Sequence, residues 1–549
     1  MALSLGVGLY FTKRASSSLS EFFLSGRSLP WWLAGTSMAA ASFAADTPLY
    51  VTGLVRGQGI YENWQWWCYI LSGMLSVFFF ARLWRRLGVL TDVQLIDLRY
   101  EGRSARILRG FKAVYFSFAI HTIIKAQIIL AMAKILEVIL GWGKWDGILV
   151  SSAIVLAYST MAGYWGVVVT DFFQFIIAMT GAILLAVVSV HKAGGLPHIM
   201  AIVPASKLAF FPSPGKAAFM AFLGYIGLSW WSKYSSDGGG IIVQRMASSR
   251  DEKQSLLATF YFNVVTFAAR TWPWVLAALA SMVLYPVLKD NETAYPKMVL
   301  DLLPTGLKGL MLSAFFAAFM SSVGTYLNLS SAYMINDLYR PFIKPDASER
   351  HYLMLSRLIT LVLAGVTALI TYHVSSIVGV FKFLIAFGSG TGLVYIARWF
   401  WWRVNAWSEI SAMMASTAVS AFVYENRLCA AMPFYDRLAA IIGVSTVIWI
   451  AVTLLTKPVS KEKLRAFYEK TLPGGPGWGD IRKGFEGRDG GNFSRPFYLW
   501  LLGSVFLVGL TMGIGKMIFG WYASGAAWLA LSFAAALALW RGVKKGGIV

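Results

Sequence analysis

The chain of 549 residues is 57% hydrophobic and 15% aromatic, and only 13% of its residues are charged. This composition excludes an ordinary soluble protein, because a soluble chain of this length divides into several domains with charged surfaces. We attribute the net charge of +22 to basic loops on one side of a membrane and expect no nucleic-acid partner, and two cysteines are too few for a disulfide framework.

Apolar runs recur along the chain, and most are about 20 residues long, which is enough to cross a lipid bilayer as a helix. We predict about fifteen such helices from these runs. They lie near residues 3–12, 31–54, 63–83, 111–141, 147–163, 165–190, 216–236, 254–286, 305–336, 352–373, 376–398, 406–424, 434–456, 496–515 and 519–541. The first run is too short to span the bilayer, so we expect it to be a partial helix.

Two of the predicted helices carry signals for an interruption. In "TSMAAASFAADTPLY" (36–50), small and polar residues end at Pro48, and proline disrupts a helix because it has no amide donor. In "SWWSKYSSDGGG" (229–240), serines and three glycines favour a break. The two breaks fall in the first helix of successive five-helix groups of opposite orientation. Paired interruptions in inverted halves mark the binding site of a transporter, and two flexible helices of a membrane bundle are the alternative.

A carboxylate and a row of hydroxyls lie within other apolar helices. Asp171 interrupts "GVVVTDFFQFIIAMTGAILL" (166–185), where a charge costs at least ~2.5 kcal/mol. The run near 305–336 places Ser321, Thr325 and Asn328 on one helical face. Hydroxyls together with the carbonyls of a broken helix suit a monovalent cation, whereas packing of small residues is the other explanation.

Most of the 48 Lys and Arg residues lie in every second loop, which places the N-terminus outside and the C-terminus in the cytoplasm. We expect a multi-pass protein of a bacterial-type plasma (inner) membrane. Its segments are a partial N-terminal helix and cytoplasmic loop (1–30), a first five-helix repeat (31–190), an extracellular loop (191–215), a second, inverted five-helix repeat (216–398), additional transmembrane helices (399–456), a cytoplasmic basic loop (457–495), and C-terminal transmembrane helices with a tail (496–549).

Five ordered motifs resemble the sodium:solute symporter family, which includes sodium–glucose, sodium–proline and sodium–sialic acid transporters. They are "EFFLSGRSLPWWLAGTSMAA" (21–40), "LTDVQLIDLRY" (90–100), "VVVTDFFQ" (167–174), "IIVQRMASSRDEK" (241–253) and "AAFMSSVGTYLNLSSAYMINDLY" (317–339). The likeness extends over about residues 20–500. It implies an all-α integral membrane protein with a LeuT-like five-plus-five inverted-repeat bundle and extra N- and C-terminal helices.

The resemblance also implies a sodium site made of three carbonyls and two hydroxyls. The carbonyls belong to Ala40, Phe43 and Ala318, and the hydroxyls to Ser321 and Ser322. Asp171 matches a family aspartate that serves a second cation or a proton in some members, with Thr325 nearby, and we expect hydroxyls such as that of Thr325 to compensate its charge. Gly324 stands where some members that bind two sodium ions have a hydroxyl residue. Whether this chain has a complete second sodium site is therefore an open question.

The solute site implied by the resemblance combines polar side chains from several core helices. These are Ser42, Asp46, Thr47, Glu62, Ser232, Ser235, Ser236, Asp237, Arg270 and Lys382. Structural salt bridges are the alternative role for Asp46 and Arg270. The match is weakest around residues 232–237, where this chain departs from the sugar transporters.

The leading hypothesis is a sodium-coupled secondary active symporter, not an enzyme, that imports a small polar organic solute by alternating access. Acidic side chains outnumber Arg270 in the expected site, which favours a neutral sugar or polyol. An unpaired Arg270 would instead hold a carboxylate and favour an organic anion. An amino-acid substrate, coupling to protons, and a sensor or transceptor without net transport are the remaining alternatives. No phosphate-binding motif of a pump occurs in the sequence.

Overall fold

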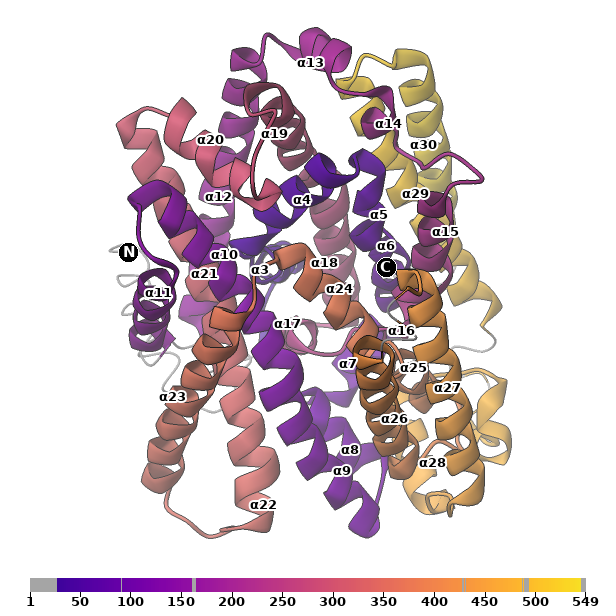
Figure 1. Ribbon diagram of the computed structural model, residues 1–549. Coiled ribbons are helices and arrows are strands. Elements are labelled where there is room, and N and C mark those ends of the chain that lie inside the picture. Colours follow the sequence, from indigo (N-terminus) through magenta and orange to yellow (C-terminus); the bar gives the residue numbers. More distant parts are fainter. Residues whose placement is uncertain are drawn as a thin grey trace.

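The computed structural model describes residues 27–89, 91–159, 164–426, 429, 431–485, 487 and 493–544 (Figure 1). Within these residues the chain is helical, and the only sheet-like pairing is an isolated bridge between Leu29 and Ser249. The partial helix expected near residues 3–12 lies outside the described residues.

The first half of the bundle runs from α3 to α12. Its helices are α3 (Trp31–Ala41), α4 (Asp46–Gly57), α5 (Trp64–Trp67), α6 (Tyr69–Leu75), α7 (Ala81–Leu87), α8 (Leu95–Arg99), α9 (Gly102–Val114), α10 (His121–Leu140), α11 (Lys144–Ser159) and α12 (Tyr164–Lys192). Wider, π-helical turns over Ser76–Phe80 and Tyr115–Ile120 connect α6 to α7 and α9 to α10, so these pairs continue one another.

Two short helices, α13 (Leu196–Ile202) and α14 (Ala205–Leu208), lead to the second half. This half contains α15 (Ala217–Gly224), α16 (Trp230–Ser232), α17 (Ile241–Ser248), α18 (Glu252–Val264), α19 (Thr271–Leu284), α20 (Ala294–Leu302), α21 (Thr305–Ala332), α22 (Arg340–Phe342), α23 (Glu349–His373), α24 (Ile377–Gly388) and α25 (Gly392–Phe400). The chain ends with α26 (Ala406–Glu425), α27 (Phe434–Leu455), α28 (Lys461–Thr471), α29 (Ser494–Ile518) and α30 (Tyr522–Lys544).

Both predicted interruptions are confirmed. The helix α3 ends at Ala41, and the chain leaves the helical conformation at Ser42 before α4 begins at Asp46. In the second half, α16 ends at Ser232 and α17 begins at Ile241. The intervening chain turns with φ of +78° at Gly238 and +84° at Gly240, which L-residues with side chains rarely adopt.

A third interruption was not predicted. The run near 376–398, which we expected to be one helix, is divided into α24 and α25, which are bent by 43° relative to each other. A Cβ on Gly392 would lie 2.2 Å from the carbonyl oxygen of Trp231. The bend therefore brings the backbone of α25 against α16 at a distance that only glycine allows.

Eight helices among the described residues are long and apolar enough to cross a membrane, or nine if α24 and α25 form one span. This number is below the fifteen that we predicted. The difference arises partly because interrupted helices such as α3 and α4, with 11 and 12 residues, are each too short to be counted.

The segment expected to be a basic loop, 457–495, contains a helix. Leu464, Phe467 and Tyr468 of α28 are buried, and α28 contacts α7 and α8. Arg86 donates a hydrogen bond to the carbonyl oxygen of Thr471 at 2.8 Å. In Figure 1, α28 and α22 lie at one end of the bundle, the α28 end, while α13 and α20 lie at the opposite end, the α20 end.

The helix α3 lies at the centre of the bundle. It contacts α12, α17, α18 and α21, and its residues from Ala34 to Ala41 are buried. The end of α3 therefore lies deep inside the protein, where its free carbonyl groups must find a partner other than water.

Candidate functional site

Asp171 of α12 is fully buried and is compensated from three helices. Its Oδ1 accepts a hydrogen bond from Ser321 at 2.7 Å, and its Oδ2 accepts one from Ser37 at 2.8 Å. The guanidinium of Arg245 lies 3.7 Å from Oδ2. The carboxylate thus joins α12 to α3, α17 and α21 through two hydroxyls and one cation.

The expectation that Thr325 compensates Asp171 is wrong for this structure. The Thr325 hydroxyl donates to the carbonyl oxygen of Ser321, one turn earlier in its own helix, at 2.7 Å. Sequence reasoning missed Ser37 and Arg245. Both lie within the motifs quoted for the family, and an intramembrane arginine is a natural partner for an intramembrane carboxylate.

The residues expected to bind sodium lie on α21 and at the interruption that ends α3. All five are buried: Ala40, Phe43, Ala318, Ser321 and Ser322. The Ser322 hydroxyl donates to the carbonyl oxygen of Ala41 at 3.5 Å, which joins α21 to the end of α3. The carbonyl oxygen of Ala40 accepts from the Phe43 amide at 2.9 Å. The Ser322 hydroxyl of α21 therefore lies at the carbonyl end of α3.

Two opposite charges flank the interruption between α3 and α4. Arg270 of the second half donates from Nη1 to the carbonyl oxygen of Ala39 and to the Ser42 hydroxyl, both at 3.1 Å. Asp46 is the first residue of α4, and its Oδ2 accepts from Gln127 at 2.5 Å. A cation at the carboxyl end of α3 and a carboxylate at the amino end of α4 both complement the helix dipoles.

Asp46 and Arg270 attract each other electrostatically. Neither of the two hydrogen bonds of Arg270 goes to Asp46, so the direct salt bridge that was one alternative is not formed. The structure therefore brings Ser42, Asp46 and Arg270 to the same interruption. The neighbouring Thr47 is half-buried in the first turn of α4.

Glu62 and Lys382 form a second group. The Lys382 ammonium lies 3.5 Å from Glu62 Oε1, which also accepts from Gln65 at 2.8 Å. Tyr50 of α4 donates to the Gln65 amide oxygen at 2.9 Å, and the Tyr50 ring lies 4.5 Å from that of Phe381. These contacts connect α4, α5 and α24, and they neutralise the charge of Glu62.

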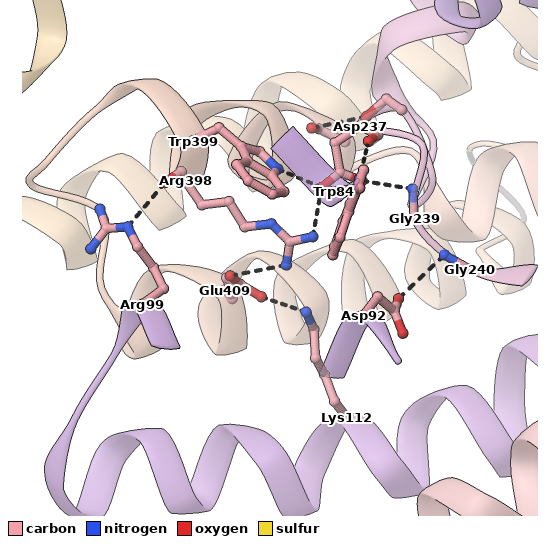
Figure 2. Close-up of polar contacts among 12 residues, drawn as sticks. Trp84, Asp92, Arg99, Lys112, Asp237, Gly239, Gly240, Arg398, Trp399 and Glu409 are labelled. Carbon is pink, nitrogen blue, oxygen red and sulfur yellow. Dashed lines mark hydrogen bonds and ion pairs between the residues drawn. The ribbon is translucent and has the colours of Figure 1, made fainter. Parts of the chain in front are cut away.

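The structure does not bring Asp237 to the α3–α4 interruption (Figure 2). Its Oδ2 accepts from Arg398 at 2.6 Å and from the Trp399 indole at 2.9 Å, and its carbonyl oxygen accepts from Trp84 at 2.7 Å. Arg398 also pairs with Glu409 at 3.4 Å. Asp237 is held by this fixed network because the glycines at 238–240 turn the chain toward α25.

Two of the three serines expected in the solute site donate hydrogen bonds to backbone carbonyl groups. Ser236 donates to the carbonyl oxygen of Gly392 at 3.1 Å, and Ser232 donates to that of Ser229 at 3.4 Å. Ser235 is half-buried in the same turn. Of this group, Ser236 is engaged at the junction with α25, as Asp237 is.

Sequence reasoning also missed Gln127 and Lys125, both on α10. Gln127 holds Asp46, as described above. Lys125 is fully buried, and its Nζ has no hydrogen-bond partner among the described residues. The signal in the sequence was a lysine within an apolar helix, which usually marks a functional position.

Known proteins resemble this chain over most of its length. The family model "Sodium:solute symporter family" matches residues 22–416. The sodium/glucose cotransporter of Vibrio parahaemolyticus is 24% identical over 502 residues, covering 84% of this chain and 90% of the relative. The osmoregulated proline transporter OpuE of Bacillus subtilis is 23% identical over 473 residues, covering 84% of this chain and 94% of the relative.

Solved structures show the same fold. A Na+-coupled sialic acid symporter has a TM-score of 0.68 at 21% identity, covering 84% of this chain and 96% of that chain. Mhp1, a nucleobase-cation-symport-1 family transporter, has a TM-score of 0.51 at 14% identity, covering 81% and 97%. The predicted LeuT-like helix bundle is therefore confirmed. The protein belongs to the sodium:solute symporter family, as a multi-pass membrane transporter and not an enzyme.

Proposed function

We propose that the protein is a sodium-coupled secondary active symporter that imports a small polar organic solute by alternating access. The observation that carries this proposal is the meeting of α3 and α21, where the Ser322 hydroxyl donates to the carbonyl oxygen of Ala41 at the buried end of α3. The carboxyl end of a helix carries partial negative charge, which attracts a small cation without a full carboxylate. An ion held in this way is bound weakly enough to be released on the other side.

In this proposal sodium is coordinated by the carbonyls of Ala40, Phe43 and Ala318 and by the hydroxyls of Ser321 and Ser322. The hydrogen bond from Ser322 to Ala41 supports the proximity of the two helices that the site requires. Ser321 has a further role, because its hydroxyl donates to Asp171 and keeps lone pairs for a cation. Occupation of the sodium site is thereby linked to the Asp171–Arg245 pair.

Asp171 and Thr325 are the residues that we propose for a second cation or a proton. Such an ion would compete with Arg245 for the Asp171 carboxylate, because the two lie 3.7 Å apart. Thr325 would have to turn its hydroxyl away from the carbonyl oxygen of Ser321. Both changes occur next to Ser321, which is also a proposed ligand of the first site. Binding of the second ion would therefore change the position of a ligand of the first.

We infer that the α28 end faces the cytoplasm of a bacterial-type plasma membrane and that the N-terminus lies outside. The helices α7, α8, α9 and α28 near this end carry many basic side chains: Arg82, Arg85, Arg86, Arg99, Arg103, Arg106, Arg109, Lys112, Lys461, Lys463, Arg465 and Lys470. An excess of Lys and Arg is typical of cytoplasmic loops.

For the solute, we propose a site around the interruption that contains Ser42, Asp46, Thr47 and Arg270, with Glu62 and Lys382 toward α24. The prediction of a neutral sugar or polyol depended on three carboxylates sharing this site. Asp237 is bound by Arg398, and Glu62 lies beside Lys382, so this count no longer favours a neutral solute. Relatives are named for glucose, proline and myo-inositol, which are different classes of solute. The class of solute must therefore be inferred from the residues of this chain.

The test of sodium coupling begins with a thermal-shift screen of the purified full-length protein against sugars, polyols, amino acids and organic acids, with and without sodium. The compounds that stabilise the protein are then used, in radiolabelled form, in proteoliposomes with an imposed inward sodium or proton gradient. We expect accumulation that follows the sodium gradient. Uptake that follows only the proton gradient, or binding without uptake as in a sensor, would contradict the proposal.

The sodium site itself is tested with Ser322→Ala. Because this change removes one oxygen ligand and leaves the helix intact, we expect the sodium concentration for half-maximal uptake to rise about fivefold to thirtyfold. Ser313→Ala is the matched control, since Ser313 is exposed on the same helix α21. If Ser322→Ala behaves as this control does, the site lies elsewhere.

A further inference from the structure

The buried charges of the bundle divide into those that are neutralised by a partner and those that are not. Paired with an opposite charge within 4.0 Å are Asp171 with Arg245, Glu62 with Lys382, Asp237 with Arg398, and Glu409 with Lys112 and Arg398. Lys134 of α10 is also paired, with Asp290 and Glu292, both at 2.6 Å. Three other buried or half-buried charged groups near the α3–α4 interruption or on α10 have no such pair among the described residues, namely Asp46, Arg270 and Lys125. Two of the three are cations.

Arg270 uses only one part of its guanidinium. Its side chain is buried, with 4% exposed, and both of its hydrogen bonds are donated by Nη1. The Nε atom is buried and has no hydrogen-bond partner among the described residues. Nε and Nη2 form the side edge of a guanidinium, and no described residue accepts a hydrogen bond from the two parallel N–H groups of this edge. Arginine keeps its proton in proteins, and the positive charge is therefore permanent.

A buried edge of this kind is a costly feature unless a ligand completes it. A buried donor without a partner loses its hydrogen bond to water and gains nothing in return. The edge matches the two oxygens of a carboxylate in a bidentate arrangement, which is stronger and more directional than a single hydrogen bond. Charged groups at membrane depth are rarely left unpaired.

Asp46 does not complete this edge. Its Oδ2 is held by Gln127 of α10, and it occupies the first position of α4. It attracts Arg270 through space, which stabilises the arginine in its buried position without using the Nε edge. On α10, Lys125 is a further buried basic side chain whose Nζ has no hydrogen-bond partner among the described residues.

We propose that the transported solute is an organic anion and that its carboxylate binds to the Nε–Nη2 edge of Arg270. The Ser42 hydroxyl accepts from Nη1 on the other side of the guanidinium and donates to the carbonyl oxygen of Ala39 at 3.0 Å, so these contacts hold Arg270 in place and leave its Nε–Nη2 edge for the solute. Asp46 then limits affinity by repulsion, which allows the anion to be released. This inference names the solute class for the symporter proposed above and rests on that proposal.

The test is a thermal-shift assay on the purified full-length protein with matched pairs of compounds in sodium. Each pair is a carboxylate and its neutral counterpart, such as glucuronate and glucose, gluconate and sorbitol, or lactate and lactamide. We expect one or more carboxylates to stabilise the protein while their neutral counterparts do not. Stabilisation by the neutral members alone or equally, or by no carboxylate of the set, overturns the inference.

Arg270→Gln is the first variant, with an expected loss of carboxylate affinity of about 10- to 100-fold. Arg270→Lys keeps the charge but loses the bidentate edge, so we expect it to recover only part of the affinity. Lys216→Gln is the control for loss of one positive charge, because Lys216 is exposed and outside the bundle interior. Unchanged carboxylate affinity in folded Arg270→Gln overturns the inference.

Asp46→Asn tests the same proposal independently if the arginine variants do not fold. Removing the carboxylate beside Arg270 should strengthen the binding of an anion by about 2- to 10-fold, whereas a neutral solute that donates hydroxyls to Asp46 would bind more weakly. The two outcomes have opposite signs. Stabilisation by sodium alone is measured in the same assay. If sodium and neutral solutes both stabilise the protein, only the proposal of an anionic solute is refuted. If sodium has no effect, the proposal of a sodium-coupled symporter is refuted.

Discussion

The two interrupted helices predicted from the sequence differ in what their polar groups do. At the α3–α4 interruption, carbonyls and hydroxyls lie beside one carboxylate and an arginine whose Nε edge has no partner among the described residues. At the α16–α17 interruption, Asp237 is enclosed by an arginine and two indoles (Figure 2). Similar sequence signals therefore produce incompletely paired polar groups in one half and a fixed polar junction in the other.

This difference suggests how the two halves divide the work of transport. A site that must exchange ligands keeps incompletely satisfied groups, because the ligand supplies the missing partner. A junction that connects helices near the α28 end pairs its two carboxylates with cations of the protein and therefore resists opening. We therefore expect substitutions at the first interruption to change ligand binding and substitutions at the second to change the stability of the fold.

The largest effect should come from breaking the closed junction. Arg398→Leu leaves Asp237 without its arginine and Glu409 with Lys112 as its remaining cation, and we expect a loss of stability of about 3–5 kcal/mol. The measurement is thermal unfolding of the purified protein in detergent. Arg357→Gln, an exposed position on α23, is the control and should change stability by less than about 0.5 kcal/mol. Equal behaviour of the two variants would show that the junction does not contribute.

A second test concerns the close contact between α25 and α16. Gly392→Ala would place a methyl group 2.2 Å from the Trp231 carbonyl oxygen, so the backbone must shift, at a cost of about 1–3 kcal/mol. In contrast, Gly309→Ala on α21 meets nothing within 4 Å and should be neutral or stabilising by up to about 1 kcal/mol. Unfolding temperatures of the two variants that shift in the same direction would contradict this reading of the third interruption.

Beside α3, Asp171→Asn should act on coupling more than on folding. The amide keeps the shape of the side chain and can still accept from Ser37 or Ser321, but it loses the charge that faces Arg245. We expect the sodium concentration for half-maximal uptake to rise about tenfold and solute accumulation against a gradient to fall. Unaltered accumulation in proteoliposomes would mean that Asp171 is structural only.

The smallest effect on stability should come from Lys382→Gln. The ammonium is partly exposed and lies 3.5 Å from Glu62, so solvent screening limits its contribution to within about 0.5 kcal/mol. An effect on solute affinity without an effect on unfolding temperature would place Lys382 in the solute site. Loss of stability comparable to that of Arg398→Leu would instead make the Glu62–Lys382 pair a second closed junction.

The sequence by itself determined the class of protein, the family and two of the three interruptions. These features depend on local chemistry: long runs of apolar residues indicate membrane-spanning helices, and glycines 238–240 permit turns that other residues resist. Pro48 lies in the first turn of α4, where proline is tolerated, so it marks the start of this helix after the interruption. The division of α24 from α25 was missed although glycines 388, 390 and 392 lie at the bend, and what the sequence could not show is that the backbone at Trp231 packs against Gly392 there.

Only the tertiary structure decided which charges meet. Asp171 pairs with Arg245, 74 positions away, and Asp237 with Arg398, 161 positions away, and no local pattern relates the members of either pair. The net charge that remains at the α3–α4 interruption is a small difference between many buried charges. That difference depends on every pairing at once, and it is therefore a property of the folded bundle and not of any segment of its sequence.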